Sequence, residues 1–291
     1  MLGRGIAAAL TGRGIATMRL VRRSPRNRAE LLWNPAAGGG IQDAVWLEGI
    51  SAAIHLSGAS IAGHRWTAAY KREMAESRID STRVLAEALA RLKTPPATLV
   101  VASAIGYYGE RGDEVLDENS APGSGYFPEL CQAWEAATQP AAEAGIRVVP
   151  MRLGMVIGPG GGAMARLAPL FRLGLGGPLG NGRQWMSWIA EADAVAAALF
   201  ALDCPTLHGP VNAVAPEPVT NAQFTRALGR AVHRPAILPA PAFALRLAFG
   251  QMADEALLAS TRVMPQRLLS AGFDFQYPTL DRAFAAALAE R

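Results

Sequence analysis

The chain has 291 residues, of which 51% are hydrophobic and 18% charged, with a formal net charge of +4. This composition supplies enough apolar material for a large core and excludes a disordered chain. No apolar run reaches membrane-spanning length without Gly, Pro or charge, and the start lacks the apolar run of a signal peptide.

The first half of the chain alternates expected helices with short apolar strands. Apolar residues at helical spacing predict helices over 4–14, 67–92 and 130–144, the first ending at Gly14. Short apolar runs bounded by turns predict strands over 16–21, 52–56, 98–102 and 147–152. This alternation predicts an α/β fold with a Rossmann-like, doubly wound parallel sheet.

The regular alternation of short strands and helices ends after Gly154. Gly-rich loops at 158–162 and 174–182 then flank an apolar helix. Further elements are expected as strands at 211–214 and 273–275 and as helices at 220–232, 241–259 and 279–290. We therefore predict a core over 1–154, to which parts of 180–218 return, and a smaller C-terminal α/β lobe over 155–291.

The first three residues, Met1-Leu2-Gly3, stand directly before the first expected helix. In a dinucleotide-binding fold a strand and a Gly-rich loop precede this helix, and the pyrophosphate rests on its N-terminus. Gly3 matches the last glycine of such a loop, although alone it could be an ordinary N-terminal glycine. We expect the first strand and most of the Gly-rich loop to be missing, which leaves a gap in the sheet and lowers stability.

Two loops predict the type of cofactor. Arg22 and Arg23 follow the expected strand at 16–21, where an acid would bind the ribose hydroxyls of NAD. Guanidinium groups suit the 2′-phosphate, so NADP(H) is favoured over NAD(H). Leu56 and Ser57 end the next strand, where small residues let the backbone approach a nucleotide; a plain turn is an equal alternative.

A Ser-containing turn follows the strand at 98–102, in the run from Ser103 to Gly109. It resembles the active-site Ser strand of extended short-chain dehydrogenases, which continue with a helix bearing Tyr-x-x-x-Lys and then Glu. Here Glu135 is present, but Cys131 stands at the Lys position and Phe127 at the Tyr position. The resemblance therefore implies the fold while questioning its usual proton chemistry.

Three residues remain as catalytic candidates. Phe127 cannot transfer a proton, and Cys131 is most simply a small buried helix residue. Ser103, Tyr107 and Tyr108 lie at the expected carboxyl end of a strand, where ligands bind in such sheets. Packing of the turn is an equal alternative for the two tyrosines.

Several motifs carry a resemblance that spans nearly the whole chain. They include His64-Arg65-Trp66-Thr67, Gly106-Tyr107-Tyr108-Gly109, Arg152-Leu153-Gly154, the run 171–180 and Arg262-Val263-Met264-Pro265. Together they resemble the epimerase-family proteins of the atypical extended short-chain dehydrogenase group, which includes YfcH-like proteins. The family's C-terminal domain would cover about 238–288.

The resemblance implies NADP(H) binding at named positions. These are Gly3, Arg22, Arg23, Leu56, Ser57, Glu73, Arg78 and Met155. In this family pattern Arg22 and Arg23 hold the adenosine phosphate, and Met155 contacts the cofactor near the nicotinamide.

A loop that closes over substrate in extended members contains Arg183, Gln184 and Trp188. Arg183 suits an anionic or phosphorylated group, whereas Asp193 is expected to begin a helix or form a structural pair. Two functions stay open: an oxidoreductase or epimerase that uses NADP(H) on a small, carbohydrate-like molecule, and an NADP(H)-binding sensor or interaction protein without turnover.

The positions of the cysteines, histidines and early arginines indicate which metal sites, compartments and partners to expect. Cys131 and Cys204 do not form a CxxC pair and the four histidines are scattered, so we expect a cytoplasmic protein without a metal site. The early arginines lack interleaved aromatic residues or a nucleic-acid motif. We therefore expect a small-molecule substrate and neither a nucleic-acid nor a membrane partner.

Overall fold

The computed structural model describes residues 1–35, 40–159 and 161–289. Its centre is a parallel sheet with the strand order β10–β6–β4–β3. The strands are β3 (Ala52–His55), β4 (Thr98–Ala104), β6 (Arg147–Leu153) and β10 (Val211–Ala213). All four lie where short runs of β-branched and other apolar residues predicted them.

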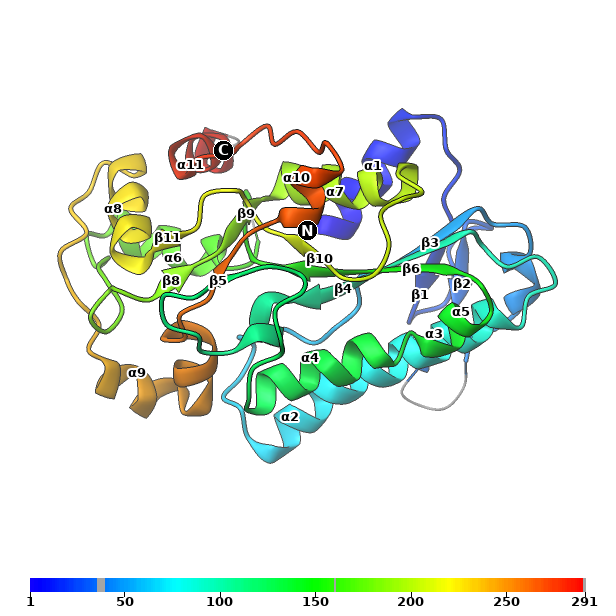
Figure 1. Cartoon of the computed structure of the whole chain (residues 1–291), viewed down its shortest axis with the longest axis horizontal. Helices are drawn as coiled ribbons and strands as arrows, with labels where there is room; N and C mark the ends of the chain where they lie inside the picture. The colour runs from blue at the N-terminus through cyan, green and yellow to red at the C-terminus, as the bar shows by residue number, and fades with distance from the viewer. Residues whose placement is uncertain (36–39, 160, 290–291) are drawn as a thin grey trace.

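Helices cover both faces of this sheet (Figure 1). One face carries α1 (Leu2–Gly12), α7 (Glu191–Asp203) and α10 (Gln266–Ser270); the other carries α3 (Ser81–Ala90), α4 (Tyr126–Ala136) and α5 (Gln139–Glu143). Strand β4 shows why: Val100 packs with the α1–α7 side, whereas Leu99 and Val101 pack with the α3–α5 side. Side chains of a strand alternate between faces, so a fully apolar strand needs cover on both.

The long helix expected over 67–92 is present in three consecutive parts. Thr67 caps α2 (Ala68–Ala75), which continues through the π-helical turn η3 (Glu76–Asp80) into α3. Such wide turns inside a helix are frequent at functional sites. This one contains Arg78, a predicted cofactor ligand.

The parallel sheet is interrupted beside β3. A separate pair is formed by β1 (Arg19–Val21) and β2 (Glu30–Leu32), and no backbone hydrogen bond between described residues joins β1 to β3. Among the described residues the sheet is thus interrupted between these two strands, where the sequence predicted a gap. The sequence did not predict β2, a three-residue strand.

The second half of the chain forms short strand pairs and further helices. The pairs are β5 (Val115–Leu116) with β12 (Arg262–Val263), β7 (Met155–Ile157) with β9 (Trp188–Ala190), and β8 (Trp185–Met186) with β11 (Val219–Thr220). The helices include α6 (Met164–Arg172), α8 (Asn221–Ala231), α9 (Ala242–Phe249) and α11 (Leu280–Ala289). A cluster around Phe171, Trp188, Phe224 and Phe284 packs α6, α8 and α11 together.

Three predicted elements differ from the structure. The segment 273–275 is not a strand, and the helix expected at 241–259 is divided into α9 and the π-helical segment η5 (Ala253–Leu257) by Gly250, whose φ is 61°. The helix expected at 130–144 begins four residues earlier, at Tyr126, and is divided into α4 and α5. Positions 160 and 290, in a predicted loop and helix, lie outside the described residues.

None of the helices in the described ranges has the length and apolarity needed to cross a bilayer.

Candidate functional site

Two of the predicted cofactor ligands, Gly3 at the start of α1 and Leu56 after β3, lie next to each other. Gly3 is exposed in the first turn of α1, and a Cβ atom on it would lie 3.9 Å from Leu56, which follows β3. The structure therefore brings together the helix N-terminus and the strand end that the sequence assigned to the same nucleotide. Ser57, one residue further, is exposed.

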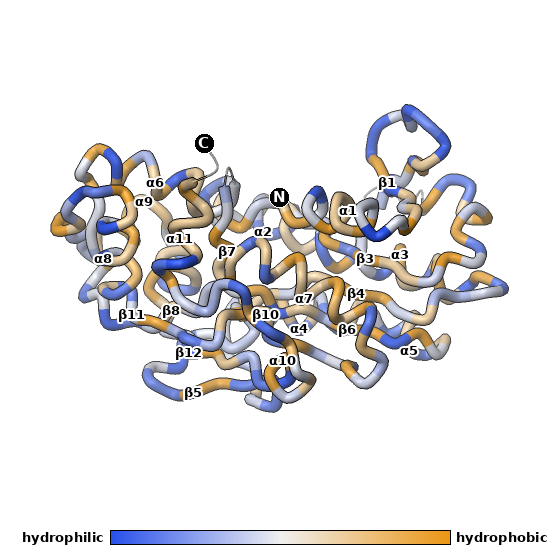
Figure 2. Tube along the Cα trace, turned by 90° about the horizontal axis from the view of Figure 1, so that it is seen from above, coloured by the Kyte–Doolittle hydropathy of each residue, from blue (hydrophilic) through white to orange (hydrophobic). Residues whose placement is uncertain are grey.

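The two arginines after β1 are in different states. Arg23 donates two hydrogen bonds of 2.8 Å to the carboxylate of Glu30, which lies on β2. These bonds, together with the one from the backbone of Arg26, lower the pKa of Glu30 to about 2. Arg22 is exposed and has no partner among the described residues. The hydrophilic loop that carries both stands away from the body of the molecule (Figure 2).

Arg78 is a buried cation without a carboxylate partner in the described part of the chain. Its side chain donates to the carbonyl oxygens of Ala59 (2.8 Å) and Met74 (3.2 Å) and stacks on Trp134, while Nε finds no hydrogen-bond partner among the described residues. Burial lowers the pKa of Arg78. A Cβ on Gly58 would lie 3.1 Å from its Cζ, so the guanidinium lies directly against the loop after β3.

Two other predicted cofactor contacts flank this region. Glu73 is exposed on α2, one and a half turns before Arg78. Met155 is partly buried at the start of β7, where its backbone N–H donates to the carbonyl of Ser187. Met155 follows β6, next to the strand that leads to Ser103.

Ser103 belongs to a buried ionic cluster. Its hydroxyl donates to Glu135 over 2.6 Å, and Arg152 binds the same carboxylate through Nε and Nη2, each over 2.8 Å. Ser103 and Arg152 are both 3% exposed. The Ser103 hydroxyl is therefore committed to an internal acceptor.

Tyr108 lies in the same cluster and is completely buried. Its hydroxyl donates to the side-chain oxygen of Asn212 over 2.7 Å and accepts from Arg152 over 3.0 Å. Burial raises the pKa of Tyr108 to about 12, in spite of the neighbouring Arg152. Its hydroxyl is thus held in the interior as a neutral group.

Tyr107 differs from its neighbour because it is only partly buried. Its ring stacks on the guanidinium of Arg152, with Cζ 3.5 Å from the ring centroid, and meets Tyr108 edge to face. The described residues provide no hydrogen-bond partner for its hydroxyl. Of the three catalytic candidates, Tyr107 alone has a hydroxyl that is not engaged.

The positions of the missing Tyr and Lys are filled by packing. Phe127 lies in an apolar cluster against Trp66, and a Cβ on Gly106 would lie 2.5 Å from its ring. Gly106 therefore makes room for the ring of Phe127. Cys131 is fully buried, and burial raises the pKa of its thiol to about 12, so it is an inert core residue as expected.

The three predicted substrate residues have different environments. Arg183 is exposed between α6 and β8. Gln184 is buried and donates to the carbonyls of Leu179 and Leu257, whereas Trp188 is fully buried and donates to the carbonyl of Glu217. The structure does not bring these three side chains to one surface.

Sequence reasoning missed the residues that complete the ionic cluster. Arg152 was noted only as part of a motif, yet it contacts Glu135, Tyr107 and Tyr108. Glu118 accepts from the backbone of Asn212 over 2.9 Å, and burial raises its pKa. Their wide separation in the chain hid this arrangement.

Comparison with known proteins agrees with this architecture. Residues 1–213 match the NAD dependent epimerase/dehydratase family, and residues 240–287 match a domain family of unknown function, DUF1731. The chain belongs to the NAD dependent epimerase/dehydratase family. The resemblance found in the sequence is thus confirmed.

Relatives within this family align over almost the whole chain. An epimerase family protein of Mycobacterium bovis is 47% identical over 287 residues, covering 99% of this chain and 94% of its own. The human epimerase family protein SDR39U1 is 34% identical over 291 residues, covering 99% and 96%. A crystal structure of that human protein with NADPH superposes with a TM-score of 0.91 at 32% identity, covering 100% of this chain and 97% of the other.

Proposed function

We propose that this chain binds NADP(H) across the carboxyl ends of β1, β3 and β4. The buried, unpaired guanidinium of Arg78 carries this proposal, because a buried charge without a counter-charge is costly and an anionic ligand would neutralise it. Gly58 leaves room beside Arg78, and Gly3 lies at the helix N-terminus, which favours a pyrophosphate. The human relative whose structure contains NADPH supports the same cofactor.

The preference for NADP(H) over NAD(H) rests on Arg22. It is exposed beyond β1 and has no partner among the described residues, so its guanidinium can bind a 2′-phosphate. Glu30, the acidic residue on β2, is already held by Arg23 and Arg19. Arg23 then serves to fix the loop beside Arg22.

For the reaction we infer an oxidoreductase or epimerase that acts on a small, carbohydrate-like molecule. The nicotinamide supplies hydride transfer when bound, and Tyr107 is the group that we assign to proton transfer. The guanidinium of Arg152 lies over the Tyr107 ring, 3.5 Å from its centroid, and fixes the ring at the end of β4. Arg183, exposed before β8, is the assigned contact for an anionic part of the substrate.

A second function, an NADP(H)-binding sensor without turnover, is favoured by the same cluster. Ser103 and Tyr108 point their hydroxyls at internal partners, and Phe127 and Cys131 occupy the usual Tyr and Lys positions. A protein built this way binds cofactor without the usual proton relay.

Titration with NADPH and NADH, followed by fluorescence, tests cofactor binding. We expect NADPH to bind more tightly than NADH. Arg22→Gln should weaken the binding of NADPH about tenfold and leave the binding of NADH unchanged. Arg28→Gln, a change in the same exposed loop, is the control. Absence of NADPH binding to the folded protein would refute the proposal.

Cofactor oxidation across a panel of carbonyl compounds and nucleotide sugars separates the two functions. If the protein is an enzyme, it should turn over at least one compound of the panel. Tyr107→Phe should then abolish turnover without changing the affinity for NADPH. Tight NADPH binding without turnover on the whole panel supports the sensor instead.

A further inference from the structure

A basic cavity lies at the C-terminal end of α8, remote from the proposed cofactor site. It is a depression that is open to solvent, with a volume of about 590 Å³. Figures 1 and 2 place α8 at the opposite end of the molecule from β1. The ligands assigned to NADP(H) do not line this cavity.

The cavity exists because the chain turns back tightly over the end of α8. The N–H of Arg234 donates to the carbonyl of Gly229 over 2.9 Å, and His233 adopts a left-handed conformation with φ 55°. A Cβ on Gly229 would lie 2.8 Å from the carbonyl oxygen of Arg234. Glycine at 229 therefore permits the close approach that forms the floor.

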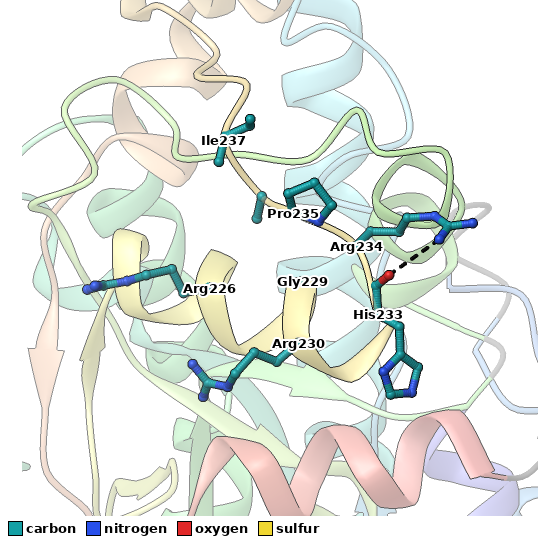
Figure 3. Close-up of a pocket in the computed structure, with 8 residues that line it drawn as sticks. Arg226, Gly229, Arg230, His233, Arg234, Pro235 and Ile237 are labelled. Atoms are coloured by element: carbon teal, nitrogen blue, oxygen red, sulfur yellow. Dashed lines mark hydrogen bonds between the residues drawn. The ribbon is translucent and has the colours of Figure 1, made fainter.

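Four basic side chains surround this floor, and none of the described residues that line it is acidic (Figure 3). Arg230 is paired with Asp281 over 2.9 Å. Arg226 and Arg234 use Nε to bond the carbonyls of Ala222 and Arg172, and neither has a carboxylate partner in the described ranges. Two guanidinium groups are thus available to an anion.

One wall of the cavity is apolar. Pro235, Ala236 and Ile237 form it, and Ile237 is 72% exposed. Basic residues at a helix C-terminus ordinarily offset the helix dipole, which accounts for Arg230 in the last turn. The dipole does not account for a cavity or for an exposed isoleucine beside it.

We propose that this cavity binds a soluble organic phosphate, with the phosphate between Arg226 and Arg234 and an apolar group against Ile237. In Figure 3 the two arginines lie on opposite sides of Gly229 and their guanidinium groups point outward, so both side chains turn inward over the floor when they bind one phosphate. Both are long, exposed side chains that can turn toward a bound anion. The site is independent of the proposed cofactor site.

Calorimetric titration with phenyl phosphate at low ionic strength tests this site. The double variant Arg226→Gln/Arg234→Gln should weaken binding at least about tenfold. Arg83→Gln/Arg91→Gln, which removes the same charge from α3 and its C-terminal cap, should leave binding unchanged. Ile237→Ser should weaken the binding of phenyl phosphate but not that of inorganic phosphate.

Three outcomes would overturn the proposal. They are no heat of binding with the wild-type protein, equal affinity in the Arg226→Gln/Arg234→Gln variant, and equal weakening in the Arg83→Gln/Arg91→Gln control. Binding to phosphatidic acid vesicles without binding to phenyl phosphate would overturn the assignment to a soluble ligand. Circular dichroism of each variant establishes that it is folded.

Discussion

Arg152 holds Glu135 through two contacts of 2.8 Å, from Nε to Oε1 and from Nη2 to Oε2. The side chains are 3% and 14% exposed, so both charges lie largely out of water. Burial opposes the charge on Arg152, but the bonds to Glu135 raise its pKa. The pair joins β6 to α4, and the hydroxyl of Ser103 on β4 donates a further hydrogen bond to Glu135.

Removing one member of this pair should be strongly destabilising. Arg152→Met leaves the Glu135 carboxylate buried without its counter-charge, and we expect a loss of about 3 kcal/mol in the free energy of unfolding. Urea unfolding followed by circular dichroism measures it. Arg246→Met breaks an exposed pair with Asp254 and should cost about 0.5 kcal/mol. Equal losses in the two variants would contradict a structural role for the Arg152–Glu135 pair.

Tyr108→Phe separates a structural from a catalytic role for the buried hydroxyl. The change leaves Asn212 and Arg152 each without one hydrogen-bond partner. We therefore expect the free energy of unfolding to fall by about 1–3 kcal/mol, while the affinity for NADPH is unchanged. Denaturant unfolding and NADPH titration measure the two quantities. Tyr277→Phe, at a partly buried tyrosine, is the control. Full stability combined with lost turnover would instead make Tyr108 catalytic.

The sequence predicted the main sheet because its strands are short apolar runs between turns. It failed at 273–275, where Phe273 and Phe275 alternate with a polar residue as in a half-buried strand. Both rings are buried against each other with centroids 4.8 Å apart, but the backbone that follows bonds to the carboxylate of Asp193. Asp193 thus has the structural role that the sequence suggested, and periodicity alone could not reveal this acceptor.

The candidate site was only partly predictable for a similar reason. Local sequence placed Ser103, Tyr107 and Tyr108 at a strand end, and the structure brings them together there. Which hydroxyl is free depends on Arg152, Glu135 and Asn212, which come from distant elements. Contacts of this range have no periodic signal in a single sequence.

Gly106→Ala tests the packing that replaces the usual catalytic tyrosine. The new methyl group would lie 2.5 Å from the ring of Phe127, so we expect a loss of about 1–3 kcal/mol in unfolding free energy. Phe127→Leu in the same chain should recover part of it, which a double-mutant cycle measures. A methyl group at Gly12 meets no atom of the described residues within 4 Å, so Gly12→Ala should not destabilise the protein. Additive effects at positions 106 and 127 would contradict the proposed contact.

His55 should make stability depend on pH between about 6.5 and 4. It is 3% exposed on β3, where Nε2 lies 3.1 Å from the hydroxyl of Ser81, and burial lowers its pKa from 6.5 to about 4. Within this window the unfolded chain binds a proton that the folded chain excludes. Stability is therefore complete above pH 6.5 and falls by about 3 kcal/mol as pH decreases to 4.

The variant His55→Gln isolates this contribution, because glutamine does not titrate and can still bond to Ser81. Urea unfolding at several pH values should give a flatter profile for His55→Gln than for the wild-type chain between pH 6.5 and 4. Buried carboxyl groups such as Glu118 and Asp193, whose pKa values burial raises, titrate in both proteins and cancel in the difference. His64→Gln changes an exposed histidine and should keep the wild-type slope. Parallel profiles for His55→Gln and the wild-type chain would show that His55 is protonated in the folded state, against its burial.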